Sequence, residues 1–406
     1  MTTRIPNQNV VSLHDPAALA NLVHECGEQN LPIIDYGVAH QGVGYSPPVD
    51  HVRLSQATLQ AGIIEHYERD LTVRADAGAT LGSLRDALKS SKQFIPVDAD
   101  DDLTLGEVIN HNVYGGLRVG YPGIRDLLLG LRYIDSNGQQ IHVGGRTVKN
   151  VAGYDLTRLM VGSLGELGLI YEATLRTYAI PDSAMTVDIR FDNPRTIDRI
   201  LPNWMVSDAS PASLILSNHT GAWTVRVEYF GGTTGRAVQL RSLETLIDRE
   251  PGVHLLGSWT RTVDDAMRES STRGAWRRTA GTLVKAVTSP STTGAICSAL
   301  AETSIAHPSL TVWAYPVHGC VFIGGDIGLE RTIALSQVID KLHSQYGGFR
   351  VWYARPQGCE HLPPFGPVQP DQPLMLRIKQ AMDPRNLFNP GRFISAIPAA
   401  TLGPSQ

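Results

Sequence analysis

The sequence predicts an α+β protein of two or three domains. Its 406 residues are more than one ordinary hydrophobic core organises. The first half combines short apolar, strand-like runs with glycine-rich segments, and the second half carries a strand–helix–strand–strand–helix order twice in succession. Two such units in a row indicate a single domain whose antiparallel sheet has its helices on one face.

Local signals define the elements of the first half. The apolar periodicity of residues 15–28 predicts a helix, and Thr80 is expected to cap a second one. The dipeptide Asn137-Gly138 lies between two apolar runs, which is typical of a β-hairpin. The expected strands are residues 31–35, 71–75, 127–134, 140–143 and 169–178.

The second half is expected to alternate strands and helices up to a helical tail. Pro202 lies inside the first of its helices and predicts a kink or a break there. The expected strands are residues 185–191, 213–216, 223–230, 282–288, 311–317, 320–323 and 349–354. The expected helices are residues 194–206, 236–249, 293–303, 329–346 and 372–382.

Composition and charge argue against several functional classes. The net charge of −4 gives no electrostatic basis for binding nucleic acid or an anionic membrane. No run of 18 apolar residues and no signal-peptide pattern is present, so we expect no transmembrane helix and a cytoplasmic location. The four cysteines are far apart and form no CxxC pair, so neither a metal or iron–sulfur site nor a disulfide framework is expected.

The strongest candidate for a ligand site is a segment with glycine at every third position. Gly162, Gly165 and Gly168 lie between an expected helix and an expected strand. Glycine allows positive φ angles and lets a flat ligand approach the backbone without a Cβ in the way. From spacing alone, a connector that is glycine-rich only for tight packing explains the pattern equally well.

Two further segments suit a dinucleotide. Small residues between Leu103 and Tyr121 could let the backbone wrap a ligand, and Arg118 could offer a bidentate fork to phosphate, although a solvated surface arginine is the simpler interpretation. The loop at residues 36–42 follows an expected strand and could present successive amides to a pyrophosphate. It does not match GxGxxG, so a Rossmann fold has no support.

Together these segments resemble the FAD-binding domain of the vanillyl-alcohol oxidase/para-cresol methylhydroxylase (PCMH) superfamily. The motifs that carry the resemblance are Ala77-Gly78-Ala79-Thr80-Leu81, Leu103 to Glu107 with Asn112, Gly115 and Gly116, Gly123 to Gly130, and Leu159 to Ile170. Within this superfamily the chain is similar to the second FAD-binding subunit, the E type, of bacterial glycolate oxidase. That similarity rests on Lys149 to Asp155 and on Asp383 to Phe393.

The resemblance implies an architecture and a set of cofactor-binding residues. Residues 1–181 would form a PCMH-type FAD-binding domain, residues 182–354 an α+β cap domain, and residues 355–406 a tail that returns to the FAD domain, with the flavin between the two domains. The implied contacts to FAD are Tyr36, Gly37, Val38, Ala39, His40, Gln41, Thr104, Leu105, Gly106, Asn112, Gly115, Gly116, Arg118, Gly162, Ser163, Gly165, Gly168, Ile170, Asn389 and Arg392.

The resemblance also implies an activity. It is the two-electron oxidation of a small 2-hydroxy acid such as glycolate, in a complex with a paralogous FAD subunit. Electrons would leave toward an iron–sulfur subunit, because this chain has no cluster ligands of its own. The sequence assigns no catalytic base, and His318 and Tyr353 are only candidates. His318 is the lone histidine where related D-lactate and D-2-hydroxyglutarate dehydrogenases carry a metal motif, so no metal site is expected.

The chain departs from the family pattern on the phosphate side. Val38 and Ala39 stand where the family has glycines, and Glu107 would cost about 1–2 kcal/mol if its carboxylate pointed at a phosphate. These departures motivate an alternative, a structural subunit that has lost FAD, and a stand-alone flavoenzyme for another hydroxy acid or alcohol also stays open. His40 falls where some family members attach flavin covalently, which is a further hypothesis.

Overall fold

The structure is a computed structural model that describes residues 10–11, 15–35, 51–54, 62–145, 155–218, 221–274, 280–302, 308–366 and 370–393. It divides the chain into two compact units. Unit 1 contains residues 1–114, 122–179 and 368–406, and unit 2 contains residues 115–121 and 180–367. The division differs from the sequence expectation in three places, since residues 115–121, 180–181 and 355–367 belong to unit 2.

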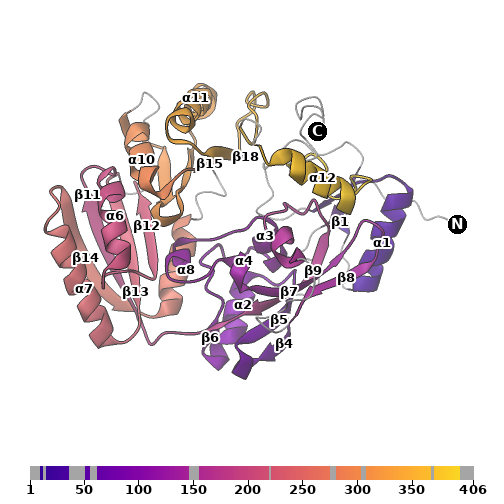
Figure 1. Cartoon of the computed structure of the whole chain (residues 1–406), viewed down its shortest axis with the longest axis horizontal. Helices are drawn as coiled ribbons and strands as arrows, with labels where there is room; N and C mark the ends of the chain where they lie inside the picture. The colour runs from indigo at the N-terminus through magenta and orange to yellow at the C-terminus, as the bar shows by residue number, and fades with distance from the viewer. Residues whose placement is uncertain are drawn as a thin grey trace. The chain divides into compact units, whose positions relative to one another are not determined.

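Unit 1 is built on two main sheets (Figure 1). A five-stranded antiparallel sheet has the order β4-β5-β9-β7-β8, and a three-stranded parallel sheet has the order β1-β3-β2. The strands are β1 Val10–Val11, β2 Ile33–Asp35, β3 Val52–Leu54, β4 Ile63–Tyr67, β5 Thr72–Asp76, β7 Leu128–Ile134, β8 Gln140–Gly144 and β9 Leu169–Arg176, with the short pair β6 Gln93–Phe94 and β10 Tyr178–Ala179 beside them.

Short helices pack on these sheets around one apolar core. The cap at Thr80 is confirmed, because its hydroxyl accepts a hydrogen bond from the Ser83 amide, and the hairpin is confirmed, with Gly138 at φ 78°. The helices are α1 Pro16–Glu28, α2 Leu81–Leu88, α3 Leu105–Asn110, α4 Ile124–Leu127, α5 Leu156–Met160 and α12 Gln372–Met382.

Unit 2 contains one eight-stranded antiparallel sheet made of two topologically equivalent halves. The order β14-β11-β13-β12 in the first half is repeated as β18-β15-β17-β16 in the second, and the halves join where β12 pairs with β16. This confirms the predicted repeat of element order. The strands are β11 Ala184–Phe191, β12 Ser213–Ser217, β13 Trp223–Phe230, β14 Val253–Arg261, β15 Thr282–Val287, β16 Thr311–Tyr315, β17 Cys320–Gly325 and β18 Phe349–Ala354.

Alternation along the strands gives the sheet of unit 2 an apolar and a polar face. Val225 and Val227 enter the core beneath the helices, whereas Arg226 between them points to the other face, where helix α8 lies. The core-side helices are α6 Thr196–Val206, α7 Thr233–Ile247, α10 Thr293–Glu302 and α11 Gly328–Tyr346, and α8 is Val263–Gly274.

Three details of unit 2 differ from the sequence expectation. Helix α6 runs through Pro202 as one element, because burial of Leu201 and Trp204 on the core outweighs the hydrogen bond that proline cannot donate. Strand β14 and helix α8 were not predicted. β14 is mostly exposed and shows no clean apolar alternation, so its sequence lacks the usual strand signal.

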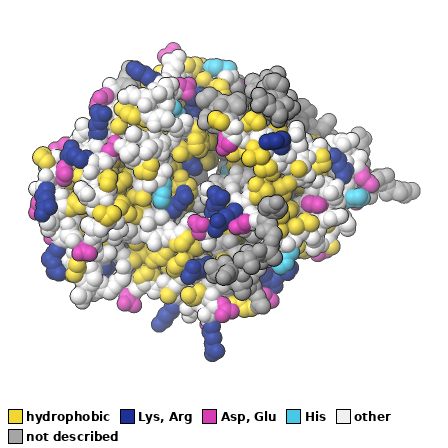
Figure 2. All heavy atoms as spheres, in the orientation of Figure 1, with side chains coloured by type: hydrophobic (Ala, Val, Ile, Leu, Met, Phe, Trp, Pro, Cys, Tyr) yellow, Lys and Arg dark blue, Asp and Glu magenta, His cyan; other side chains and the backbone are white. Residues whose placement is uncertain are grey.

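Charged side chains of both signs are dispersed over the face seen in Figure 2, in keeping with the small net charge. No helix of the described chain is long and apolar enough to cross a membrane.

Candidate functional site

The glycine-rich loop of residues 162–168 is held against the C-terminal end of helix α3 in unit 1. The Gly162 amide donates to the Ile109 carbonyl, and the Leu164 amide donates to the Asn110 carbonyl, both at 2.9 Å. Gly162 and Gly165 have φ angles of 81° and 70°, which residues with a Cβ rarely adopt. Two loops that are far apart in sequence therefore form one paired surface.

Two buried polar atoms on these paired loops carry no hydrogen bond within the described part of the chain. They are Oδ1 of Asn110 and Oγ of Ser163. Because buried polar atoms are almost always hydrogen-bonded, such a pair indicates a ligand with donors and acceptors at its edge. An isoalloxazine ring has such an edge, so the paired loops fit a flavin.

The sequence analysis proposed Ser163 and Asn112 as cofactor contacts, whereas the two buried atoms without a hydrogen bond belong to Ser163 and Asn110. Asn112 has a φ angle of 48°, a left-handed conformation that asparagine tolerates better than most residues. The backbone thus explains why asparagine stands at 112. Only the buried position of Asn110, which the sequence does not reveal, distinguishes the two.

Asn389 of the tail ties the loop to the end of strand β2. Its Oδ1 accepts a hydrogen bond from the Asp35 amide at 2.8 Å, and its Nδ2 donates to the Leu164 carbonyl at 2.9 Å. A Cβ built on Gly165 would lie 2.4 Å from that same Nδ2. Gly165 is therefore glycine partly to admit Asn389, and Asn389, predicted as a cofactor contact, acts here as a positioning residue.

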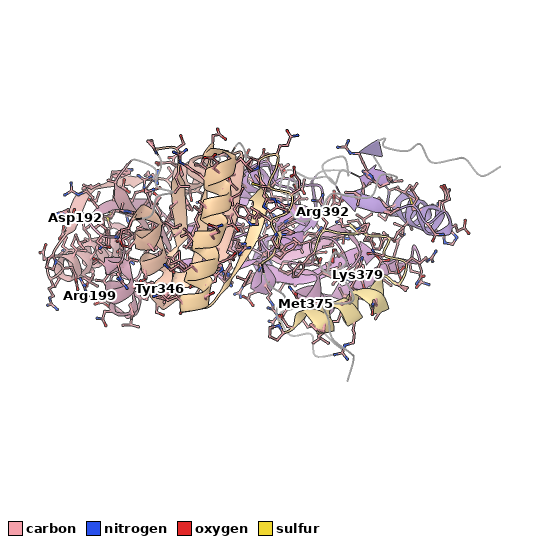
Figure 3. All side chains as sticks on the ribbon, turned by 90° about the horizontal axis from the view of Figure 1, so that it is seen from above. Asp192, Arg199, Tyr346, Met375, Lys379 and Arg392 are labelled. Carbon is pink, nitrogen blue, oxygen red and sulfur yellow. The ribbon has the colours of Figure 1, made fainter. Side chains whose placement is uncertain are left out.

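A buried lysine fixes the tail beneath the same loop. Nζ of Lys379 on α12, which is labelled in Figure 3, donates to the carbonyls of Glu166 and Phe388 and to the Asp383 carboxylate, at 2.6, 2.9 and 2.6 Å. Asp383 also accepts the amides of Leu387 and Phe388. The sequence marked the segment that begins at Asp383 as a family feature, but gave no signal for Lys379.

The polar groups in the first turn of helix α3 form hydrogen bonds within unit 1. The Thr104 hydroxyl accepts from the Glu107 amide, and the Glu107 carboxylate accepts from the Thr104 amide and hydroxyl at 2.8 and 2.9 Å, which is a capping box. The amides of Leu105 and Gly106 donate to the carbonyls of Ala79 and Ala77. These amides lie in the segment that was expected to wrap a dinucleotide, but they bond within unit 1, and the Glu107 side chain caps its own helix.

Three buried charged groups lie near the end of β2. Burial, followed by the negative charge of Glu107, raises the pKa of Asp35 to about 8, against the opposing effect of Arg392. All three side chains are more than nine-tenths buried. Asp35 directly precedes the predicted first FAD loop. That loop, Tyr36 to Gln41 with Val38, Ala39 and His40, and the segment Lys149 to Tyr154 lie outside the described residues.

The segment Gly115 to Tyr121 packs on unit 2 rather than on the glycine loop. A Cβ on Gly116 would lie 2.3 Å from Ser213 Oγ, and one on Gly120 would lie 2.8 Å from the Ala212 Cα, so both glycines permit close contact with the β12 region. Arg118 lies beside His318, where burial and the arginine charge lower the histidine pKa to about 4. Packing on the β12 region therefore accounts for Gly116 and Gly120.

The last two predicted positions around the ring belong to the sheet of unit 1. A Cβ on Gly168 would lie 2.7 Å from the Tyr133 ring, and Ile170 pairs with Tyr133 across β7 and β9. In unit 2, the candidate base Tyr353 packs its ring near Phe322. Among the residues that the structure describes, no group of three or more His, Cys, Asp and Glu could hold a metal ion.

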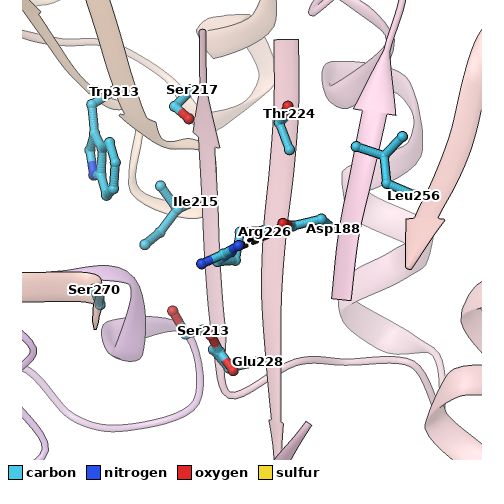
Figure 4. A pocket seen from close by; sticks show the side chains of 10 residues that line it. All are labelled: Asp188, Ser213, Ile215, Ser217, Thr224, Arg226, Glu228, Leu256, Ser270 and Trp313. Carbon is cyan, nitrogen blue, oxygen red and sulfur yellow. Dashed lines mark hydrogen bonds and ion pairs between the residues drawn. The ribbon is translucent and has the colours of Figure 1, made fainter. Parts of the chain in front are cut away.

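A polar pocket lies on the face of the unit 2 sheet that α8 covers (Figure 4). Arg226 pairs with Asp188 at 2.6 Å and with Glu269 at 2.5 Å. Arg261 pairs with Glu228 at 2.7 Å and also with Glu269. The pocket is lined by Asp188, Ser213, Ile215, Ser217, Thr224, Arg226, Glu228, Leu256, Ser270 and Trp313. Sequence reasoning named none of these residues.

Comparison with known proteins identifies the nucleotide-binding part of the chain. Residues 7–144 match the family described as FAD binding domain. Residues 7–144 are therefore the part of the chain that is similar to FAD-binding domains. This part holds Asn110 and the end of β2, and the glycine loop continues unit 1 beyond the matched residues.

Two curated relatives of the chain are named as glycolate oxidase subunits. It is 31% identical over 209 residues to glycolate oxidase subunit GlcD of Bacillus subtilis (strain 168), covering 50% of this chain and 44% of that protein. It is 33% identical over 129 residues to glycolate oxidase subunit GlcE of Escherichia coli (strain K12), covering 31% and 37%. The chain thus matches less than half the length of each of these two relatives.

Solved structures show the same fold over nearly the whole chain. A carbohydrate oxidase from Microdochium nivale superposes with a TM-score of 0.75, covering 96% of this chain and 92% of that one. The sequences are only 11% identical, so this likeness concerns the fold alone.

Proposed function

We propose that the protein oxidises a small 2-hydroxy acid, such as glycolate, with FAD as the electron acceptor. The observation that carries the proposal is the pair of unsatisfied polar atoms in unit 1, Asn110 Oδ1 within the residues that match an FAD-binding domain and Ser163 Oγ on the glycine loop beyond them. The similarity to the glycolate oxidase subunits supports the substrate class. Bound FAD would supply the two-electron chemistry, and the protein would supply binding and orientation.

The residues of unit 1 would divide that work. Asn110 and Ser163 would hydrogen-bond the flavin. Asn389 and Lys379 would hold the loop in a fixed position, because their side chains bond its backbone at Leu164 and Glu166. Such positioning matters because a loop displaced by one ångström loses its hydrogen bonds to the ring.

We further propose that the chain works as one subunit of a complex. The relatives GlcD and GlcE are both named as subunits of glycolate oxidase, which supports partner subunits in general. The partners that we propose are a paralogous FAD subunit and an iron–sulfur subunit. The described residues contain four buried, unpaired cysteines and no cluster of metal ligands, so the chain shows no electron relay of its own there.

The capping box argues against the alternative of a subunit that has lost FAD. That alternative depended on the negative charge of Glu107 lying close to a phosphate. The Glu107 carboxylate is instead bonded to Thr104 at the N-terminus of its own helix.

Anaerobic mixing of the FAD-loaded protein with glycolate and with D-lactate tests the proposal. Bleaching of the flavin absorbance by either acid supports a 2-hydroxy acid oxidoreductase. Flavin that binds but is reduced by neither acid, while an alcohol or a sugar reduces it, would favour the stand-alone enzyme for another substrate. Reduction only when partner subunits are present would support the complex.

A further inference from the structure

A second pocket in unit 2 surrounds a buried arginine. It lies between helix α11, strand β18 and the segment that follows β18, and it shares no lining residue with the pocket of Figure 4. The polar residues around it are Ser336, Gln337, Asp340, Arg350 and His361. Ser336, Gln337 and Asp340 occupy one face of α11, at the spacing of successive turns.

Arg350 carries a charge that its surroundings only partly compensate. Its side chain is 3% exposed, and burial lowers its pKa, which shows that the protonated form is poorly solvated. Its Nη1 forms an ion pair with Asp340, whose side chain is 48% exposed. Its Nε has no hydrogen-bond acceptor in the described chain. A guanidinium has five N–H donors, so one half-exposed carboxylate leaves part of it unsatisfied.

The wall opposite Arg350 is fixed by hydrogen bonds. The Trp352 amide donates to the Pro364 carbonyl at 2.8 Å, and the Arg355 guanidinium donates to the Leu362 carbonyl at 2.6 Å. Gly366 lies against the arginine, since a Cβ there would be 3.6 Å from Arg350 Cγ. The pocket is therefore a structured cavity with a preformed cation in it.

We propose that this pocket is an anion site that takes a small oxyanion, a carboxylate or a phosphate, against Arg350. The side edge of a guanidinium, Nε with one terminal nitrogen, matches two oxygens of such a group. The buried hydroxyl of Ser336 and the amide of Gln337 would add neutral donors. Asp340 would compete with the ligand for the guanidinium. The site is independent of the proposed oxidation, because it uses none of the residues assigned to the flavin.

Calorimetric titration of the FAD-saturated protein with sodium phosphate, and separately with sodium acetate at constant ionic strength, tests the proposal. Saturating FAD blocks phosphate binding at the flavin site. Saturable binding of either anion is expected, and the better ligand identifies the source as phosphorylated or carboxylic. Arg350→Gln should abolish binding, whereas Arg331→Gln, which removes an exposed arginine from helix α11, should leave it unchanged.

Two surface variants keep the test decisive if Arg350→Gln fails to fold. Asp340→Asn removes the competing carboxylate and should tighten anion binding by about threefold, and Gln337→Glu should weaken it by a similar factor. Failure of both anions to bind, or affinities that do not respond to Asp340→Asn and Gln337→Glu, would overturn the proposal. Flavin reduction by hydroxy acids is measured separately, so the two proposals can fail independently.

Discussion

The glycine loop of unit 1 and the charged pocket of unit 2 are stabilised in different ways. The loop depends on two side chains from the tail, Asn389 and Lys379, that bond its backbone. In the ion-pair network at the pocket, Arg226 and Arg261 each contact two carboxylates and share Glu269, so the loss of one partner leaves another in place. We therefore expect one substitution at Asn389 or Lys379 to displace the loop, whereas the ion-pair network should keep its structure when one carboxylate is lost.

The largest effect is expected from Lys379→Met. The substitution leaves the fully buried Asp383 carboxylate without its cation, and removing one partner of a buried pair costs about 3–5 kcal/mol. Urea unfolding followed by circular dichroism measures the change. Lys89→Met, which removes an exposed lysine from unit 1, is the control, and an equal effect of the two would contradict the role given to Lys379.

Gly165→Ala should have the next largest effect. A Cβ there would meet Asn389 Nδ2 at 2.4 Å and would sit at a φ angle of 70°, which together cost about 2–4 kcal/mol. The variant should also bind FAD more weakly, because the loop must shift away from Asn389. Gly62→Ala is the matched control, since a Cβ at Gly62 meets nothing within 4 Å. If both variants bind FAD with similar affinity, Asn389 does not determine the position of the glycine loop.

Glu269→Gln tests the buffering of the unit 2 pocket. Both arginines lose one carboxylate but keep Asp188 and Glu228, so the free energy of unfolding should fall by only about 1–2 kcal/mol. A loss as large as that of Lys379→Met would show that the pocket is no more tolerant than the loop, and the comparison would fail.

The pH dependence of stability tests the buried carboxyl group of Asp35. Asp35 keeps its proton in the folded protein up to a pKa of about 8, whereas the same group ionises near pH 4 in the unfolded chain. Between pH 4 and pH 8 the folded state thus binds more protons than the unfolded state. The neutral carboxyl group contributes its full stability below pH 4, and this contribution is lost as the pH rises through 8. Asp35→Asn, always neutral, should gain stability relative to the parent protein between pH 5.5 and pH 8. Asp86→Asn changes an exposed residue of α2, so its free energy of unfolding should depend on pH as that of the parent protein does. The same pH dependence in Asp35→Asn would contradict the raised pKa of Asp35.

Sequence reasoning predicted the elements better than the contacts between them. The cap at Thr80 and the hairpin at Gly138 depend on residues within a few positions, so they were predictable. Lys379 was not, because its partner Glu166 is 213 residues away. Gly116 shows the same limit. The sequence predicted that Gly116 contacts FAD, yet its close neighbour in the structure is Ser213.

The candidate site was predictable as a region but not as a set of atoms. The glycine spacing and the family resemblance located the loop and Ser163. Choosing Asn110 over Asn112 required knowing which asparagine is buried and which one adopts a left-handed backbone conformation.

The most direct test of the account is a fluorescence titration of the purified protein with FAD, in parallel with Ser163→Ala. The account predicts saturable quenching of flavin fluorescence and an affinity that falls by about fivefold to tenfold in the variant, the usual effect of one lost hydrogen bond. Absence of flavin bands from the purified protein, together with no binding of added FAD, would contradict it.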